Sequence, residues 1–260
     1  MPYPVICVLD TETTGLDPTS GAVVEFAACI MQTKDGVWAP SEVFSRFVHP
    51  GMPIPPESSA IHHIVDADVV DAAPLAHVLD TFGLWLASRG TTPALFAAHN
   101  APFDRGFLGL LAQKYSEVPW LCTKRLAHHL MPDLPSYSNQ ALRYRLHLAP
   151  QFALATSCGG RTDPHSAAGD AIVTASLLCH ELALARTQLP DVRGLRQLAQ
   201  YADTPHLIAR MPFGKHKGEP FTDLPADYLD WLKRTTTDPD ILFTIAHRSS
   251  LHAASPHQVS

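Results

Sequence analysis

The stretch from Val5 to Leu16, VICVLDTETTGL, joins a run of five apolar residues to two carboxylates. The apolar run predicts a buried strand, on which side chains two positions apart point to the same face and lie within about 7 Å of each other. Asp10 and Glu12 are therefore expected to face the same space. Two like charges at that separation repel, which costs stability unless one protonates or a cation lies between them. The stretch thus predicts a central strand that ends in a binding site.

The size and composition of the chain indicate a soluble globular protein. Its 260 residues give room for one sizeable domain and a small appendage, or for two modest domains. The start of the sequence lacks the pattern of a secretory signal, and we expect no segment with the roughly 20 apolar residues that span a bilayer. The five cysteines stand singly, which argues against a disulfide framework or a zinc knuckle. We therefore expect a cytoplasmic protein with no membrane partner.

Charge is unevenly distributed along the chain. The formal net charge is −6, which argues against a protein coated with basic surface. Residues 105–150 reverse the balance, with six Lys or Arg against two Asp or Glu. An acidic site beside a basic stretch is what a metal-dependent enzyme acting on a polyanion needs. The alternative is that these basic residues form a solvated helix face.

The pattern of apolar residues predicts an α/β fold with a mixed sheet and helices on both faces. Extended runs at 3–10, 22–33 and 42–49 are separated by turn signals at hairpin spacing, which indicates antiparallel pairing. A Pro-rich loop at 50–60 and a helical pattern after Pro74 lead to a further strand at 94–98. The remaining helices are predicted at 102–115, 123–130, 138–146, 165–186 and 193–202.

We expect three parts: a main domain at 1–188, a small accessory module at 189–248 and a disordered tail at 249–260. A small apolar core is predicted for the module from Phe213, Phe221, Leu224, Tyr228, Leu229, Trp231 and Leu232. The module also carries a basic loop, GKHKG, at 214–218. This loop is either a turn of solvated charge or a contact for nucleic acid.

A third carboxylate, Asp104, follows the strand at 94–98. Asn100 is a suitable helix N-cap and Pro102 is tolerated in a first turn, which places Asp104 at a helix N-terminus. An acid there can simply complement the helix dipole. However, the end of a central strand is also where ligands of open α/β sheets gather. Asp104 is therefore a candidate to join Asp10 and Glu12.

A fourth carboxylate, Asp170, is predicted inside a helix for which Asp163 and Pro164 would be the N-cap and first residue. It lies close to a stripe of small apolar residues, where a carboxylate is costly without a partner, and a metal would supply one. His165 precedes it by five residues, about 140° around a helix, so the two are not expected to share a ligand face. In isolation such a histidine is expected to be solvent-exposed.

Three segments, DTETTGL, AHNAPFDRGFL and HSAAGD, resemble in this order the motifs of the DEDD-type 3′→5′ exonucleases. The resemblance is to the histidine-containing branch that includes the proofreading epsilon subunit of bacterial DNA polymerase. Asp10, Glu12, Asp104 and Asp170 match its four acidic ligands, and His165 matches its histidine. IHHI at 61–64, WLCTKRLAHHLMP, YSNQALRYRL and the C-terminal FGKHKGEPFTDLPADYLDWL are similar to exonuclease X-like proteins. A ribonuclease H-like, mixed five-stranded sheet with a small C-terminal module is implied.

The implied activity is metal-dependent 3′→5′ hydrolysis of DNA to nucleoside 5′-monophosphates, in DNA repair or proofreading. Two divalent ions, Mg²⁺ or Mn²⁺, suit a set of four carboxylates. Asp10 is expected to bridge both ions, Glu12 and Asp170 to hold one, and Asp104 to contribute to the other. His165 is expected to be the general base, because a histidine ordinarily titrates near pH 6.5.

A further set is expected to contact the terminal nucleotide or its phosphates: Thr13, Gly15, Leu16, His62, Asn100, Phe103, Arg105 and Lys124. Leu16 and Phe103 either stack on bases or pack in the core, and Asn100 either binds the nucleotide or caps its helix. The expected partner is nucleic acid, either single-stranded DNA or duplex 3′ ends. Two alternatives remain open. One is an RNA-trimming exonuclease, which would differ in its contacts to the 2′-hydroxyl; the other is an inactive binding module, which would be expected to lack a ligand.

Overall fold

The computed structural model describes residues 2–248, and its centre is a five-stranded sheet with the order β3-β2-β1-β4-β5. Its strands are β1 Tyr3–Thr13, β2 Val23–Lys34, β3 Val37–Phe47, β4 Thr91–Ala98 and β5 Trp120–Cys122. β2 pairs antiparallel with β1 and β3, whereas β4 runs parallel to β1 and β5. The predicted mixed five-stranded sheet is confirmed.

β1 is the central strand, and its side chains alternate between two buried layers. Ile6 and Val8 belong to one core cluster, and Val5, Cys7 and Leu9 belong to the other. Because the side chains of a strand alternate, the residues at positions 10 and 12 continue on the face of Ile6 and Val8. β1 extends to residue 13, three residues beyond the prediction, so both carboxylates lie within the strand.

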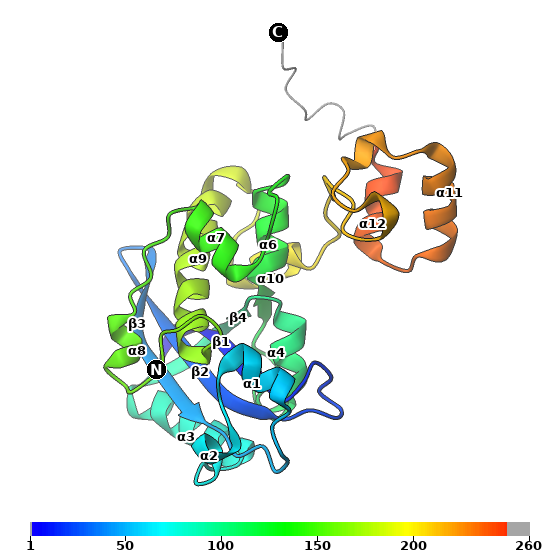
Figure 1. Cartoon of the computed structure of the whole chain (residues 1–260). Coiled ribbons are helices and arrows are strands. Elements are labelled where there is room, and N and C mark those ends of the chain that lie inside the picture. Colours follow the sequence, from blue (N-terminus) through cyan, green and yellow to red (C-terminus); the bar gives the residue numbers. More distant parts are fainter. Residues whose placement is uncertain (1, 249–260) are drawn as a thin grey trace.

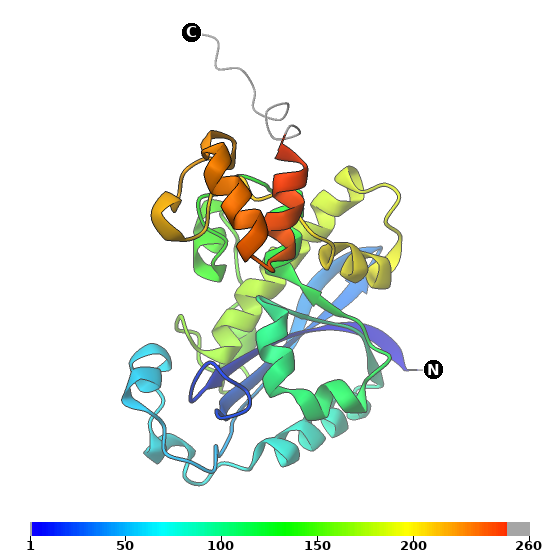
Figure 2. The same cartoon turned by 90° about the vertical axis from the view of Figure 1, so that its right-hand side faces the viewer.

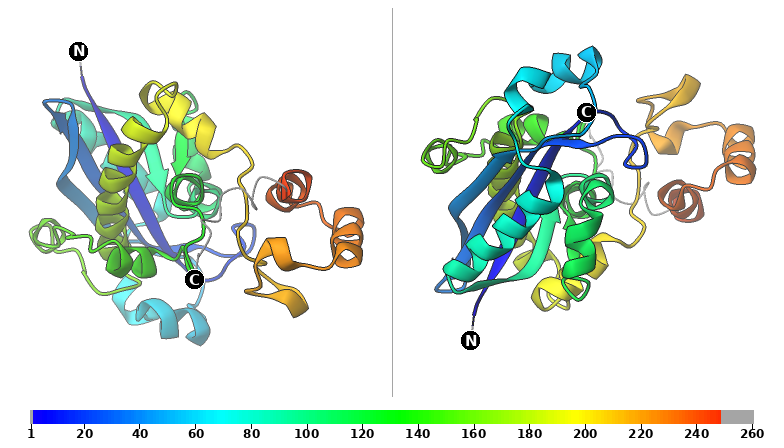
Figure 3. Two further views of the ribbon diagram at one scale, coloured as in Figure 1. Left: turned by 90° about the horizontal axis from the view of Figure 1, so that it is seen from above. Right: turned by 90° about the horizontal axis from the view of Figure 1, so that it is seen from below.

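Helices cover both faces of this sheet (Figures 1 and 3). α9 (Ala167–Gln188) and α6 (Thr123–Leu130) pack in the cluster of Ile6 and Val8, and α3 (Leu75–Ser88) packs in the opposite cluster. The other helices of the main domain are α1 Pro56–His62, α2 Asp66–Val69, α4 Ala101–Phe107, α5 Gly109–Lys114, α7 Asn139–Arg145, α8 Ala153–Thr156 and α10 Gly194–Ala202. The sheet is therefore sandwiched between helical layers, as predicted.

α9 differs from the prediction at its start. The helix begins at Ala167, and its N-cap is Ser166, whose Oγ accepts a hydrogen bond of 3.3 Å from the N–H of Gly169. The predicted cap at Asp163 and Pro164 is wrong, because both residues lie in the turn before the helix. Among the described residues α9 is also the one helix long and apolar enough to cross a membrane, which the sequence analysis did not foresee. Its most apolar window is 67% buried inside the protein, consistent with its packing on the sheet.

Two other local predictions need correction. The predicted helix at 102–115 is two helices, α4 and α5, because the backbone of Leu108 leaves the helical region at φ −93° and ψ 33°. The stretch 50–60, predicted as a loop, contains the start of α1. Asn100 does occupy the N-cap position of α4, but its φ is 79° and its side chain makes no capping hydrogen bond. Asparagine tolerates this left-handed conformation better than most residues.

The accessory module lies to one side of the main domain (Figures 1 and 2). Its elements are the 3₁₀ turns Gly214–His216 and Phe221–Asp223 and the helices α11 Ala226–Thr235 and α12 Pro239–Ala246. Its buried core is formed by Met211, Phe221, Leu224, Leu229, Leu232 and Ile241. Two residues predicted for this core lie outside it: Phe213 is 45% and Trp231 is 49% exposed.

α10 follows the predicted boundary at residue 188 but packs with the main domain. Its buried residues Leu198, Ala199 and Ala202 belong to the same core cluster as α9. The arginine of α6, Arg125, then ties the two parts together by hydrogen-bonding the carbonyl of Ala202 at 3.1 Å and the carboxylate of Asp240 at 2.8 Å. The structure therefore groups α10 with the sheet, while the domain boundary itself stays a prediction. The predicted tail at 249–260 lies outside the described residues.

Candidate active site

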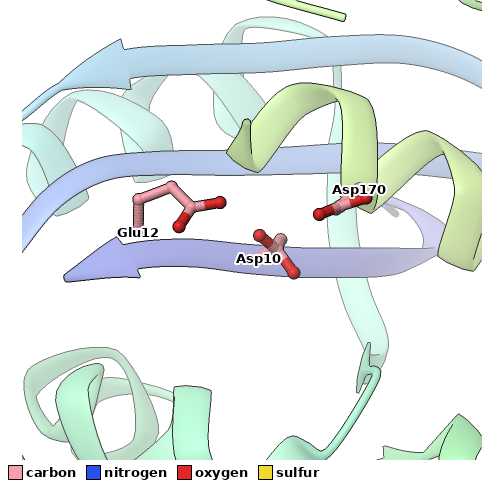
Figure 4. A group of neighbouring side chains, drawn as sticks. All are labelled: Asp10, Glu12 and Asp170. Atoms are coloured by element: carbon pink, nitrogen blue, oxygen red, sulfur yellow. The ribbon is translucent and has the colours of Figure 1, made fainter. Parts of the chain in front are cut away.

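Three predicted ligands meet where β1 passes the N-terminal end of α9. Asp10 and Glu12 rise from β1 and Asp170 descends from α9, with their carboxylates facing a common space (Figure 4). Each residue offers an oxygen, and these oxygens lie within 4.8 Å of one another. The alternation of β1 brings Asp10 and Glu12 to the face on which α9 packs. The fold therefore unites residues that are 160 positions apart.

Asp104 approaches the same region from α4. It is 3% exposed, and its Oδ1 accepts a hydrogen bond of 2.9 Å from the hydroxyl of Thr11. It lies outside the group within 4.8 Å, yet its charge is close enough to be the main electrostatic influence on Asp10. Thr11 thus connects the strand of the first two carboxylates to the helix of the third.

Asp170 is held in place by hydrogen bonds to both of its oxygens. Oδ1 accepts from the side-chain amide of Gln140 at 2.6 Å, and Oδ2 accepts from the backbone N–H of His165 at 3.1 Å. Asn139 adds a bond of 3.2 Å to the carbonyl of Asp170. Both amides come from α7, so this short helix orients the ligand of α9.

His165 lies in the exposed turn before α9, with a left-handed φ of 59°. The sequence pattern predicts His165 at the start of that helix, and the later start of α9 places it in the preceding turn instead. Its backbone reaches Asp170, so the two residues are neighbours although they do not share a helical face. The exposed position leaves the imidazole free to meet water or substrate.

The carboxyls at this site resist ionisation. Burial, together with repulsion from Asp104, Asp170 and Glu12, raises the pKa of Asp10 well above its ordinary value. Burial and repulsion from Asp170 raise the pKa of Glu12 to about 8. Burial also raises the pKa of Asp104 to about 7. For Asp170, burial raises the pKa more than the hydrogen bonds of Gln140 and His165 lower it. A site of this kind favours a bound cation.

The donor set fits divalent metal ions that prefer oxygen. At an effective dielectric of about 20, two ionised carboxylates within 4.8 Å repel by about 3 kcal/mol or more. Within residues 2–248 no Lys, Arg or His side chain forms an ion pair with Asp10, Glu12 or Asp170. Carboxylate oxygens are the preferred ligands of Mg²⁺ and Mn²⁺. Arg161 lowers the pKa of Glu12 and Arg143 lowers that of Asp170, but burial outweighs both, so the residues present suit such ions.

A fifth carboxylate at the site, Glu25, was missed by the sequence analysis. It pairs with Glu12 across β1 and β2, is 2% exposed, and accepts a hydrogen bond of 3.1 Å from the N–H of Ala167. Arg161 lies 3.7 Å from it and donates to the carbonyl of His62 at 2.9 Å. The signal was a single acid within the apolar run VVEFAA. Glu25 therefore forms an ion pair with a protein cation, whereas no such pair within the described residues involves Asp10, Glu12 or Asp170.

Thr13, Gly15 and Leu16 follow Glu12 directly, at the end of β1 that carries the carboxylates. Thr13 is buried and its hydroxyl donates to the carbonyl of Gly15 at 2.7 Å, while Leu16 is 86% exposed. Space beside Gly15 is open, since a Cβ there would meet nothing within 4 Å. His62 is 2% exposed, and its Nδ1 accepts from the N–H of Ile64 at 3.1 Å. The contact of His62 with substrate stays a prediction.

The remaining predicted contacts lie on α4 and α6. Asn100 and Arg105 are exposed, whereas Phe103 is partly buried with its ring centroid 5.1 Å from that of Phe107. Lys124 is half-buried and lines a groove that also includes Asn100. The structure thus leaves Leu16, Asn100, Arg105 and Lys124 accessible, and it gives Phe103 a packing role on one side of its ring.

Known proteins share this fold and much of this sequence. The family model described as Exonuclease matches residues 7–178, and a model named for a quorum-sensing-regulated virulence factor matches residues 204–239. The chain is 30% identical over 255 residues to Exodeoxyribonuclease 10 of Escherichia coli K12, covering 92% of this chain and 96% of that protein. It is 28% identical over 206 residues to DNA polymerase III subunit epsilon of Treponema pallidum, covering 75% and 88% of the two chains.

Solved structures of two nucleases share the fold of this chain. Exonuclease X in complex with 5′ overhanging duplex DNA superposes with a TM-score of 0.55 at 28% identity, over 76% of this chain and 99% of that chain. The nuclease domain of 3′hExo bound to rAMP gives a TM-score of 0.54 at 16% identity, over 70% and 92%, which shows the fold alone. The chain belongs to the exonuclease family, with its ribonuclease H-like fold, and is a 3′→5′ exonuclease.

Proposed function

We propose that this enzyme is an exodeoxyribonuclease that depends on Mg²⁺ or Mn²⁺, removes nucleoside 5′-monophosphates from DNA 3′ ends, and acts in DNA repair or proofreading. The observation that carries the proposal is the cluster of Asp10, Glu12 and Asp170, whose carboxylates form no ion pair among the described residues. Support for DNA as the substrate comes from the similarity over nearly the whole chain to a protein named Exodeoxyribonuclease 10.

Metal ions would be held by Asp10, Glu12 and Asp170, with Asp104 contributing from α4. When bound, divalent ions offset the repulsion among these carboxylates, polarise the scissile phosphate and lower the pKa of an attacking water. Hydrogen bonds from neighbouring residues keep two of these ligands in place. Gln140 and the N–H of His165 orient Asp170, and the hydroxyl of Thr11 orients Asp104.

His165 is proposed to take the proton from the attacking water. Its position in an exposed turn, one residue before the N-cap of α9, leaves the ring accessible to solvent. Its backbone bond to Asp170 fixes the turn beside the ligand cluster. A positioned general base of this kind typically contributes about 10²- to 10⁴-fold to the rate.

The terminal nucleotide is proposed to lie against the accessible residues beside the carboxylates. Leu16 offers an exposed apolar surface for the terminal base, and Asn100 offers an exposed amide at the start of α4. Arg105 and Lys124 are proposed to contact phosphates. These contacts do not read a base sequence, which suits an enzyme that removes successive nucleotides.

The test compares matched DNA and RNA oligomers of one sequence, each incubated with Mg²⁺ and analysed for products by chromatography. We expect nucleoside 5′-monophosphates either from the DNA oligomer alone or from both oligomers, with the DNA oligomer hydrolysed at least about tenfold faster than the RNA oligomer. RNA hydrolysed as fast as DNA or faster would overturn DNA as the substrate and would support the RNA-trimming alternative. The single difference between the two substrates is the 2′-hydroxyl, so the comparison isolates that contact.

A further inference from the structure

The accessory module carries an open aromatic cavity that the catalytic site does not use. The cavity measures about 400 Å³ and is lined by Phe213, Gly214, Lys215, Asp227, Tyr228 and Trp231. Tyr228 and Trp231 are stacked, with ring centroids 5.5 Å apart and planes at 30°. The ammonium of Lys215 lies 5.4 Å from the centroid of Tyr228. We call Phe213, Tyr228 and Trp231 the aromatic shelf.

The exposure of this shelf is not explained by the stability of the module. Phe213 and Trp231 are 45% and 49% exposed, although they were predicted in the core. The core closes without them, through Met211, Phe221, Leu224, Leu229, Leu232 and Ile241. Large aromatic side chains left together on a surface mark an interaction site. The aromatic shelf is therefore suited to bind a ligand with flat apolar faces.

A groove of about 850 Å³ connects this module to the main domain. On the main-domain side it is lined by Asn100 and Pro102, which begin the helix that carries Asp104, and by Lys124. On the module side it is lined by Pro212 and Lys217. The GKHKG loop separates the two cavities, with Lys217 in the groove and Lys215 at the shelf. A chain-like ligand can therefore pass from α4 over this loop to the shelf.

Charge in the groove favours an anion. Its two acidic residues are already paired, Asp240 with Arg125 at 2.8 Å and Asp133 with Arg210 at 3.6 Å. Lys124 and Lys217 form no ion pair with any residue of the described chain. One free cation thus stands on each side of the groove. The lining of the shelf cavity includes one cation, Lys215, and one carboxylate, Asp227, so its formal charges cancel and stacking is the main contribution there.

We propose that the module holds a single nucleic-acid strand of the substrate. Its phosphates lie in the groove between Lys124 and Lys217, and its bases stack on the aromatic shelf. Stacking platforms beside a positively charged groove bind single strands without reading their sequence. The proposal rests on the proposed function, because the groove begins at the helix of a catalytic carboxylate. A strand held in this way stays bound while its 3′ end is shortened, so successive cleavages follow without release.

The test measures binding of single-stranded DNA of 4 and 30 nucleotides to the full chain in EDTA, by fluorescence anisotropy. Trp231→Ala is expected to weaken binding of the 30-mer by about 5- to 160-fold, the range for one lost stacked base, and to change binding of the 4-mer less than about twofold. Lys217→Ala is expected to lower the slope of log affinity against log salt by about 0.7, the share of one phosphate contact on a single strand. Tyr3→Ala is the matched control, since Tyr3 is a 48% exposed aromatic at the start of β1.

Unchanged binding of the 30-mer by Trp231→Ala would overturn the proposal and would indicate that the shelf serves another kind of partner. Phe213→Ala, outside every helix, repeats the test if Trp231→Ala alters the circular dichroism spectrum. Trp231→Phe should restore most of the affinity, because it keeps a stacking ring. Failure of the proposed function is separate: a wild-type protein that binds the 30-mer through the shelf but hydrolyses no strand would overturn the function and leave this inference standing.

Discussion

The metal-free protein is expected to lose stability as pH rises, because its active-site carboxyls must ionise beside one another. Folding raises the pKa of Glu12 from 4.5 to about 8, so the folded state holds this proton more tightly than the unfolded state. The stability that comes from this proton is complete below pH 4.5 and is lost as pH rises through about 8. The full difference corresponds to about 5 kcal/mol. Asp10 and Asp104, whose pKa values are also raised, act in the same direction.

Glu12→Gln removes this titration while keeping the size of the side chain. In EDTA we expect the variant to match the wild type at about pH 4 and to exceed its free energy of unfolding by about 2–5 kcal/mol at about pH 8. Urea titrations followed by tryptophan fluorescence measure both values, and Glu57→Gln on the exposed face of α1 is the matched control. Comparing variant with wild type cancels the opposite slope of buried neutral histidines such as His99, whose pKa is lowered to about 4. Equal pH dependence in the variant and the wild type would refute the reasoning.

Four further substitutions test the site and the module contact. Asp10→Ala should abolish Mg²⁺-dependent hydrolysis and weaken metal binding measured by calorimetry, and retention of a tenth of the wild-type rate would contradict Asp10 as a metal ligand. His165→Ala should lower kcat by about 10²- to 10⁴-fold while substrate binding persists, whereas normal kcat with weaker binding would make it a substrate contact. Arg161→Met should lower kcat more than it changes KM, because Glu25 loses its partner at 3.7 Å; a shift in the thermal midpoint alone would limit Arg161 to stability. Arg125→Ala should lower the free energy of unfolding by about 2–3 kcal/mol in urea titrations, because Asp240, 8% exposed, loses its arginine and keeps only the contacts of His206; an unchanged value would show that the pair contributes little.

The part of the fold that depends on local periodicity could be predicted from the sequence. The apolar run from Val5 to Leu9 and the helix at 123–130 are found where their patterns place them. The side-chain alternation of β1 also predicts that Asp10 and Glu12 share a face. Their meeting with Asp170 could be expected only from the resemblance to known exonucleases, because no local pattern states which helix packs on β1.

Competing local signals explain most of the errors. Both Asp163-Pro164 and Ser166 can start a helix, and the hydrogen bond from Gly169 to Ser166 shows which one does. Phe213 and Trp231 fit a core pattern, but the module closes its core with Met211 and Ile241 instead. The role of Glu25 depends on Arg161, which is 136 positions away and has no recognisable spacing from it. Contacts of this kind follow from tertiary packing alone.

The most direct test of the central claim is the digestion pattern of a 5′-labelled single strand with a free 3′-hydroxyl, followed with Mg²⁺ and with EDTA. We predict a ladder that shortens by one nucleotide at a time from the 3′ end with Mg²⁺, no digestion in EDTA, and none by Asp10→Ala. A circular strand of the same sequence should remain intact because it offers no 3′ end. Internal fragments from the circular strand, or hydrolysis that continues in EDTA, would contradict a metal-dependent 3′→5′ exonuclease at Asp10, Glu12 and Asp170.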